Sequence, residues 1–255
     1  MTAPDDPRDF YDGLAGEYHL IFADWWTSAR RQGEVLGKVL RGRGVEPPAA
    51  LLDCTCGIGT QALPLAAQGF QVTGSDLSGA AVERARAEAD ARGIDVRLRV
   101  ADVRALPEDR RYAAVVSGDN SLPHLVTDDD LAAALASVRA RLSPGGLFLA
   151  SIRDYDAILR DNPSGVMPAM HDVAGERRIV GQAWRWSADR RTVEINMFFL
   201  RQQSSAWSTT VHTTTYRALR RHELTAALQA TGFREVEWLA PEAIGYHQPV
   251  VTARA

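Results

Sequence analysis

The sequence predicts a doubly wound α/β fold with a mostly parallel sheet, and three observations support this prediction. Short apolar runs of strand length alternate with longer segments of helix length between residues 49 and 154. The first run ends in a glycine-rich turn, DCTCGIGTQA, as a strand-to-helix turn would. Acidic residues follow successive runs, where the carboxyl ends of parallel strands meet at one edge of a sheet.

Two helical segments are expected before the sheet begins. Residues 10–23 form the first, and residues 27–42 form the second, which carries an apolar stripe of valines and leucines. We expect residues 1–46 to form an N-terminal helical lid over the sheet.

The alternating segments then form a Rossmann-like core over residues 47–172. Ser78 and Gly93 are a typical N-cap and a typical stop for one of its helices. The expected strands span 49–54, 70–76, 95–102, 112–119 and 147–154, and the expected helices span 59–69, 78–93 and 127–142.

The pattern changes to β structure without helices over residues 173–217. Val193, Ile195, Met197 and Phe199 alternate strictly with polar residues, which is typical of an antiparallel sheet. This β insertion would serve as a substrate lid or as the face of a homo-oligomer. Residues 218–255 return to the core as a helix, a strand and an antiparallel last strand.

Composition narrows the function classes. The 255-residue chain has a formal net charge of −3, whereas proteins that bind nucleic acids or anionic membranes usually have a basic balance. Lys38 is the only lysine, so Schiff-base enzymes, protein kinases and Tyr-x-x-x-Lys dehydrogenases are disfavoured. The acidic N-terminus has no apolar signal region, and Cys54 and Cys56 are too close for a comfortable disulfide or a closed zinc site. We therefore expect a cytoplasmic protein with reduced thiols and no metal.

The glycine turn and the acids that follow the strands predict a nucleotide-like ligand. Gly57 and Gly59 let the backbone approach a ligand at the start of a helix. Asp53 precedes these glycines, Asp76 could accept both ribose hydroxyls, and Asp102 could meet an adenine amino group. The turn at residues 117–120 after the fourth strand should face the same crevice, and its Ser117, with Leu77 and Val103, completes the expected cofactor contacts. Nicotinamide cofactors share this pattern, so an NAD(P)-dependent oxidoreductase remains an alternative.

The order of these elements resembles the class I S-adenosylmethionine (SAM) dependent methyltransferases over residues 49–153 and the C-terminal helix and strands. Thr55 stands where that family's D/E-x-G-x-G-x-G motif has its first glycine. The resemblance implies SAM as the methyl donor and S-adenosylhomocysteine as the product, with no metal.

Three further stretches are similar to the glycine, sarcosine and dimethylglycine N-methyltransferase family: FYDGLAGEYHLIFADWWTSARRQ, GDNSLPHL and SIRDYDAIL. The resemblance implies that Tyr11 lies near the sulfonium and that Arg30 or, as we expect, Arg31 binds the methionyl carboxylate. It also implies that Asn120 contacts the reacting amine and that Arg153, with Tyr155 beside it, binds the substrate carboxylate. Tyr216 and Tyr246 match further substrate tyrosines of that family less closely.

The residue types themselves suit methyl transfer. An in-line displacement needs positioning and electrostatics rather than an enzyme nucleophile. Tyr18 and Trp25, like Tyr11, could present aromatic faces to the sulfonium charge, although Trp25 could equally be helix packing. Arg153 could bind a carboxylate bidentately or pair with a neighbouring aspartate, and His124 in the GDNSLPHL turn is a further candidate for substrate binding.

Our leading hypothesis is a SAM-dependent methyltransferase acting on a small molecule, with the amino nitrogen of glycine, sarcosine or a related amino acid as the favoured acceptor. The alternatives are an N-, C- or O-methyltransferase of a larger biosynthetic metabolite, an NAD(P)-dependent oxidoreductase, and a non-catalytic SAM-binding protein. Methylation of a flipped nucleic-acid base is disfavoured, because the GDNSLPHL turn lacks the paired prolines of [DNS]-P-P-[YFW].

Overall fold

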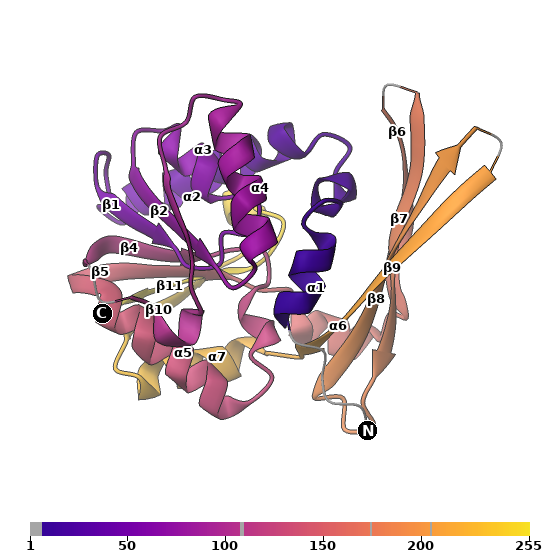
Figure 1. Cartoon of the computed structure of the whole chain (residues 1–255). Coiled ribbons are helices and arrows are strands. Elements are labelled where there is room, and N and C mark those ends of the chain that lie inside the picture. Colours follow the sequence, from indigo (N-terminus) through magenta and orange to yellow (C-terminus); the bar gives the residue numbers. More distant parts are fainter. Residues whose placement is uncertain (1–6, 108–109, 174, 205) are drawn as a thin grey trace.

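The computed structural model describes residues 7–107, 110–173, 175–204 and 206–255, so the first six residues of the expected lid lie outside it. A seven-stranded sheet in the order β10-β11-β5-β4-β1-β2-β3 forms the core (Figure 1). Its strands are β1 (Ala50–Asp53), β2 (Gln71–Asp76), β3 (Arg97–Val100), β4 (Tyr112–Ser117), β5 (Leu142–Ser151), β10 (Arg234–Leu239) and β11 (Val250–Arg254).

The direction of the strands confirms the predicted doubly wound fold. Strands β3, β2, β1, β4 and β5 run parallel to one another. Strand β11 lies between β5 and β10 and is antiparallel to both, which confirms the predicted antiparallel last strand.

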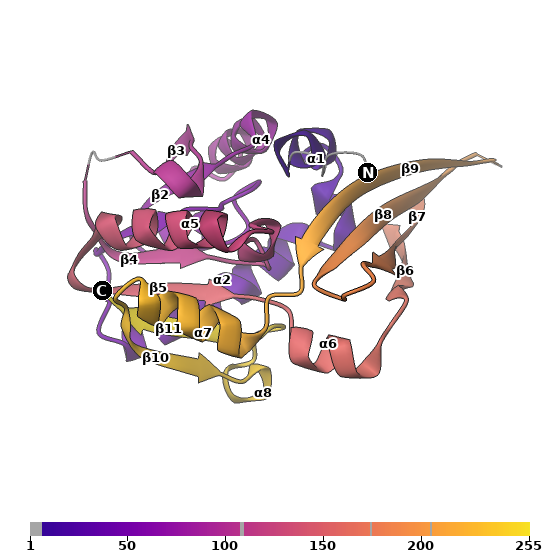
Figure 2. The same cartoon turned by 90° about the horizontal axis from the view of Figure 1, so that it is seen from below.

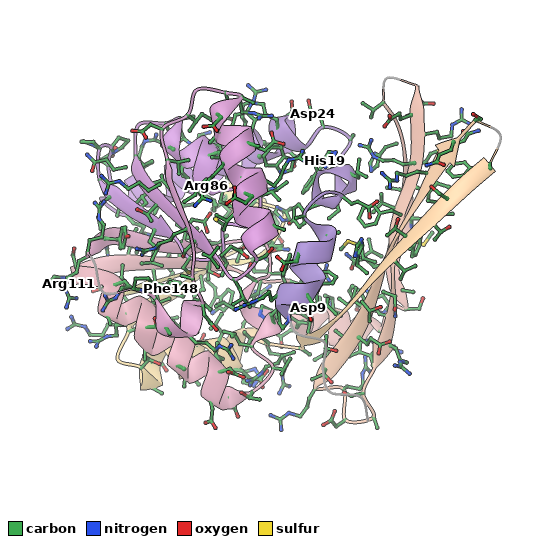
Figure 3. All side chains as sticks on the ribbon, viewed as in Figure 1. Asp9, His19, Asp24, Arg86, Arg111 and Phe148 are labelled. Atoms are coloured by element: carbon green, nitrogen blue, oxygen red, sulfur yellow. The ribbon has the colours of Figure 1, made fainter. Side chains whose placement is uncertain are left out.

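Helices cover both faces of this sheet (Figure 2). Helices α5 and α7 bury leucines against one face together with Phe148, which lies inside the core (Figure 3). Helices α2 and α3 pack on the opposite face, and α4 lies beside them against β2 and β3. The helices are α2 (Trp25–Gly42), α3 (Ala62–Ala66), α4 (Gly79–Asp90), α5 (Asp128–Arg141) and α7 (Arg221–Ala230).

The N-terminal segment differs from the single helix expected over 10–23. It forms α1 (Pro7–Leu14) and a separate 3-10 turn, η1 (Tyr18–Ile21). Gly16 lies between the two, and a Cβ added at this position would meet no atom within 4 Å. Glycine has a low helix propensity, which favours a break in the helix here. The break turns the chain so that Tyr11 and Tyr18 both face the edge of the sheet.

The second sheet has four antiparallel strands in the order β6-β7-β8-β9 and stands beside α1 (Figure 1). Its strands are β6 (Gly165–Val173), β7 (Glu176–Trp186), β8 (Thr192–Gln203) and β9 (Ala206–Arg217). Strand β6 begins before the expected boundary at residue 173, so the 47–172 segment reaches into this sheet. Because β6 is an exposed edge strand, its residues do not alternate in burial and gave no strand signal.

The inner face of the four-stranded sheet explains the alternation of β8. Val193, Ile195, Met197 and Phe199 are buried, and Met197 and Phe199 pack with Phe10 and other residues of α1 and η1. The sheet thus presses α1 against the core.

Two short helices were not predicted: α6 (Tyr155–Asp161), between β5 and β6, and α8 (Pro241–Ile244), before β11. Each is only a turn or two long, too short to show a helical period in the sequence. Across the described ranges, no helix combines the length and the apolar character needed to cross a lipid bilayer.

Candidate functional site

A cavity of about 410 Å³ opens at the carboxyl ends of the parallel strands, under α1. Its wall joins the glycine turn after β1, the ends of β2 and β3, the turn after β4, and α1 with η1. Eight residues predicted for the site line it: Tyr11, Tyr18, Gly57, Asp76, Leu77, Asp102, Val103 and His124.

The glycine turn requires both of its glycines. Gly57 has a φ of +51°, and a Cβ there would point into open space beside the cavity. Gly59 has a φ of +94°, and a Cβ there would lie 2.7 Å from the side chain of Leu63. Gly57 therefore exposes its backbone to a ligand, whereas Gly59 lets the turn pack closely on α3.

Asp76 is the best-placed carboxylate for a ribose. One oxygen, Oδ2, accepts the backbone N–H of Gly57 at 2.8 Å, and Oδ1 accepts that of Ser78 at 3.0 Å. Burial raises the pKa of Asp76, while these backbone hydrogen bonds favour its ionised form. Each oxygen keeps further acceptor capacity toward the cavity that it lines.

Asp53 lies behind the glycine turn rather than in the cavity wall. Its side chain is buried, and one oxygen accepts the backbone N–H of Thr55 at 3.4 Å. Its other oxygen, Oδ2, has no hydrogen-bond partner among the described residues. Burial raises the pKa of Asp53 to about 8.

Asp102 is already engaged by a neighbouring cation. Arg104 donates to both oxygens of Asp102, and its Nη1 also donates to Asp130 at 2.6 Å. Burial favours the neutral acid, but the hydrogen bonds from Arg104 outweigh it and hold the pKa of Asp102 below its usual value. Arg104 and Asp130 line the cavity and were not predicted; an arginine two residues after a strand-end aspartate was the available signal.

These residues fit SAM. The expected ribose and adenine acids lie in one wall. The glycine turn, in which Gly57 exposes its backbone, separates them from β4, and a buried carboxylate oxygen behind this turn has no partner among the described residues. The described residues contain no group of three His, Cys, Asp or Glu side chains that could hold a metal ion.

His124 connects α1 to the four-stranded sheet. Its Nε2 lies 2.8 Å from the Tyr11 hydroxyl, its Nδ1 lies 3.4 Å from the Thr214 hydroxyl, and its ring centre lies 4.3 Å from that of Tyr216. Burial and the positive charge of Arg153 lower the pKa of His124 to about 3, so its imidazole is neutral near pH 7.

Arg153 follows β5 and lies between two aromatic rings. Its guanidinium carbon is 5.3 Å from the Trp184 ring centre and 5.5 Å from that of Tyr216, and its Nη2 donates to Gln182 at 3.2 Å. Its Nη1 is buried without a hydrogen-bond partner among the described residues. Arg153 therefore keeps donor capacity for an additional acceptor.

The alternative interpretation, in which Arg153 forms an ion pair with a neighbouring aspartate, is wrong. Asp154 instead accepts a hydrogen bond from the Arg221 guanidinium at 2.6 Å, and Asp156 contacts the backbone N–H of Arg221. These contacts anchor the start of α6 on α7 and leave Arg153 outside the ion pair.

Asn120 and Tyr155 lie behind the cavity wall. The Asn120 Oδ1 accepts the backbone N–H of Arg153 at 2.9 Å, and its Nδ2 donates to the Tyr155 hydroxyl at 3.1 Å. Both side chains are buried, and burial raises the pKa of Tyr155. In this arrangement the Asn120 amide fixes the start of the Arg153 loop rather than facing an amine.

Four other predicted residues also lie outside the cavity wall. The Trp25 indole donates to the Thr60 hydroxyl at 3.1 Å and packs on α2 and α4 residues, as the packing interpretation expected. Ser117 is buried, with its hydroxyl 3.0 Å from that of Thr55. Tyr216 packs behind His124. Arg31 is exposed on α2.

Tyr246 lies at the opposite side of the site. Its hydroxyl is 3.0 Å from Gln32 Oε1 and 3.1 Å from an oxygen of Asp119. Asp119, Thr60 and Gln61 line the cavity and were not named as site residues. Asp119 lies in the turn after β4 that was expected to face the crevice, whereas the positions of Thr60 and Gln61 depend on where α3 packs, which no local sequence pattern reports.

The sequence comparisons agree with this geometry. Residues 51–146 match the profile of a methyltransferase domain family. Over this segment the chain is similar to methyltransferase domains. The matched segment runs from β1 into β5 and holds the glycine turn, Asp76 and Asp102.

Among curated relatives, a glycine/sarcosine N-methyltransferase of Halorhodospira halochloris is 29% identical over 154 residues, covering 60% of this chain and 56% of that protein. A dTDP-3-amino-3,4,6-trideoxy-alpha-D-glucopyranose N,N-dimethyltransferase of Streptomyces venezuelae is 29% identical over 133 residues, covering 52% and 54%. The chain thus spans about half the length of the curated relatives it matches.

Among solved structures, Streptomyces venezuelae DesVI superposes with a TM-score of 0.76 at 21% identity, covering 98% of this chain and 99% of DesVI. The amino pentose methyltransferase CalS10 of Micromonospora echinaspora gives a TM-score of 0.73 at 21% identity, covering 89% and 92%. At this identity the superpositions show a shared fold that includes nearly the whole chain.

Proposed function

We propose that the chain transfers a methyl group from SAM to the amino nitrogen of a small carboxylate-bearing acceptor, with glycine, sarcosine or a related amino acid favoured. The observation that carries the acceptor class is Arg153, whose buried Nη1 has no hydrogen-bond partner among the described residues. Arg153 is half-buried and does not itself line the cavity, but the Tyr216 ring contacts both Arg153 and the cavity-lining His124. A free guanidinium donor in this position suits a small anionic group.

The donor side is supported by the cavity wall. Asp76 would accept hydrogen bonds from the ribose, while Asp102 and Val103 would meet the adenine. The exposed backbone of Gly57 allows the sulfur-bearing chain to pass close to the glycine turn. The volume of about 410 Å³ is near the lower end for ligand pockets, so the space beside this donor suits a small acceptor.

The aromatic residues around Arg153 strengthen its use as an anion site. Trp184 and Tyr216 flank the guanidinium and shield part of it from water, which makes a charge-assisted hydrogen bond stronger. Gln182 occupies one donor and fixes the plane of the group. Lysine has no planar fork with which to replace this geometry.

Bound SAM supplies an electrophilic methyl carbon on a positively charged sulfur. Tyr11 and Tyr18 present rings and hydroxyl groups to the cavity, and their burial raises both pKa values, so the hydroxyls stay protonated. Together with α1 they cover one side of the cavity and limit the access of water to it. Transfer would form a bond between the acceptor nitrogen and the methyl carbon as the bond from that carbon to sulfur breaks, and the proton on nitrogen would then pass to solvent.

His124 positions Tyr11 in this scheme. With its pKa lowered to about 3, the imidazole is too weak a base to hold a proton near pH 7. The acceptor amine must therefore arrive already neutral. Catalysis rests on orientation and on the low-dielectric surroundings.

An amino sugar is a second candidate acceptor. The S. venezuelae relative supports it, because its name specifies an amino-sugar nucleotide. This relative and the H. halochloris relative are both named as enzymes that methylate nitrogen. An amino sugar without a carboxylate would leave the Arg153 donor without a partner.

The test is incubation of the purified chain with SAM and separate acceptors, followed by mass spectrometry for a gain of one methyl group. The panel contains glycine, sarcosine, dimethylglycine, other amino acids and amino sugars. Methylation of an amino acid supports the proposal. Methylation of amino sugars alone replaces the acceptor class, and binding of NAD(H) in preference to SAM overturns the proposed activity.

A further inference from the structure

The methionyl end of the cofactor site has an unexpected composition. The resemblance implied that an arginine of α2 binds the methionyl carboxylate, but Arg30 and Arg31 are both exposed and neither lines the cavity. The α2 residue that packs behind this part of the wall is Gln32, which is 6% exposed and accepts a hydrogen bond from the cavity-lining Gln61. Another group must therefore recognise the charged end of SAM, if SAM binds here as proposed above.

The order of the strands locates this end. Strands β3, β2, β1 and β4 lie side by side in that order across the sheet. The expected adenine acid follows β3, and the expected ribose acid follows β2. A ligand that continues across the glycine turn after β1 reaches the turn after β4. The carboxylate in this turn that lines the cavity is Asp119.

Asp119 is held firmly in this position. Its backbone N–H donates to the Ser151 hydroxyl at 2.9 Å, and its Oδ1 lies 3.1 Å from both the Tyr246 hydroxyl and Nε2 of His247. Its φ of +51° is in the left-handed region, where Asp and Asn are tolerated better than most residues. The side chain is 14% exposed, so its charge is only partly screened by water.

Beyond the Tyr246 hydroxyl and the His247 imidazole, the polar side chains next to Asp119 are uncharged amides. The Gln61 Nε2 donates to Gln32 Oε1 at 2.8 Å, and the Tyr246 hydroxyl lies between Gln32 and Asp119. Gln61 and Thr60 line the same side of the cavity as polar groups without charge. The described residues in this wall thus present a carboxylate and neutral groups, and no guanidinium.

We infer that the Asp119 carboxylate is the counter-ion of the α-ammonium group of SAM, and that the Gln32–Gln61 pair stands in place of an arginine at the methionyl end. This inference rests on the proposed function and assigns the recognition of the amino-acid part of the cofactor. Because S-adenosylhomocysteine carries the same ammonium group without the sulfonium, it isolates this contact from methyl transfer.

The test is calorimetric binding of two ligands to the full chain: S-adenosylhomocysteine and 5′-methylthioadenosine, which lacks the amino-acid part. Asp119→Asn keeps the size and the tolerance of positive φ but removes the charge. We expect it to weaken S-adenosylhomocysteine about tenfold or more, as loss of a hydrogen-bonded charge pair would, and to change 5′-methylthioadenosine less than twofold. Asp76→Asn is the matched control, because it should weaken both ligands by similar factors.

Equal weakening of the two ligands by Asp119→Asn, or no weakening of either, overturns the inference. A measurement on the unaltered chain covers the case in which the variant does not fold. There, a deaminated analogue of S-adenosylhomocysteine should bind about tenfold more weakly than the parent, and equal binding also overturns the inference. If the unaltered chain binds neither adenosyl ligand, the proposed function itself fails.

Discussion

Replacing Asp76 with alanine tests the placement of the cofactor most directly. In the free protein each oxygen of Asp76 already accepts one backbone N–H, from Gly57 at 2.8 Å and from Ser78 at 3.0 Å. A carboxylate offers about four lone-pair sites, so two remain for the ribose hydroxyls. The substitution removes both kinds of contact.

The expected loss of affinity follows from these contacts. A hydrogen bond to a charged group contributes about 1.5–3 kcal/mol, so two ribose contacts contribute roughly 3–6 kcal/mol at most. In the alanine variant, water can hydrogen-bond to the ribose hydroxyls in place of the carboxylate, which offsets part of this loss of binding free energy. We expect S-adenosylhomocysteine to bind between about tenfold and a thousandfold more weakly, corresponding to roughly 1.4–4 kcal/mol.

Isothermal titration calorimetry measures this change, and thermal unfolding reports the fold. The Gly57 and Ser78 amides lose their acceptor, so the free energy of unfolding should also fall by about 1–3 kcal/mol. Asp90→Ala removes the same charge at an exposed position on α4 and should leave binding unchanged. If Asp76→Ala lowers the melting temperature but preserves the affinity, the ribose does not lie at Asp76 and the reasoning is refuted.

Three further outcomes are expected. Arg153→Lys should raise the KM for a carboxylate acceptor at least about tenfold, because the planar fork is lost, while the KM for SAM changes little; equal effects on both would oppose an acceptor role. Because the pKa of His124 is lowered to about 3, kcat/KM should show no inflection near pH 6.5 and should rise with pH as the acceptor amine loses its proton. An inflection near pH 6.5 that disappears in His124→Asn would contradict this. Burial raises the pKa of Asp53 from 3.8 to about 8. Between these pH values the folded chain therefore binds more protons than the unfolded chain, so the contribution of Asp53 to the free energy of unfolding falls as the pH rises. Asp53→Asn should therefore raise the melting temperature more at pH 8 than at pH 5, and equal shifts at both would show that Asp53 is ionised in the folded chain.

The site could be predicted from sequence where a local pattern fixes it. Gly57, Asp76 and Asp102 line one cavity because each directly follows a parallel strand, and such ends meet at one edge of the sheet. The role of Arg31 could not be judged in this way. Adjacent helix residues point about 100° apart, and the packing of α2 selected Gln32 for the interior.

The sequence by itself determined the strand–helix alternation, the antiparallel last strand and the row of acids above the glycine turn. These features follow from hydrophobic period and turn chemistry, which act over a few residues. Only the tertiary structure decided that the Asp119 carboxylate contacts Tyr246, that Arg104 engages Asp102, and that Arg153 lies between Trp184 and Tyr216. Those outcomes depend on contacts between segments far apart in the chain, and their relative positions are set by the packing of the whole core.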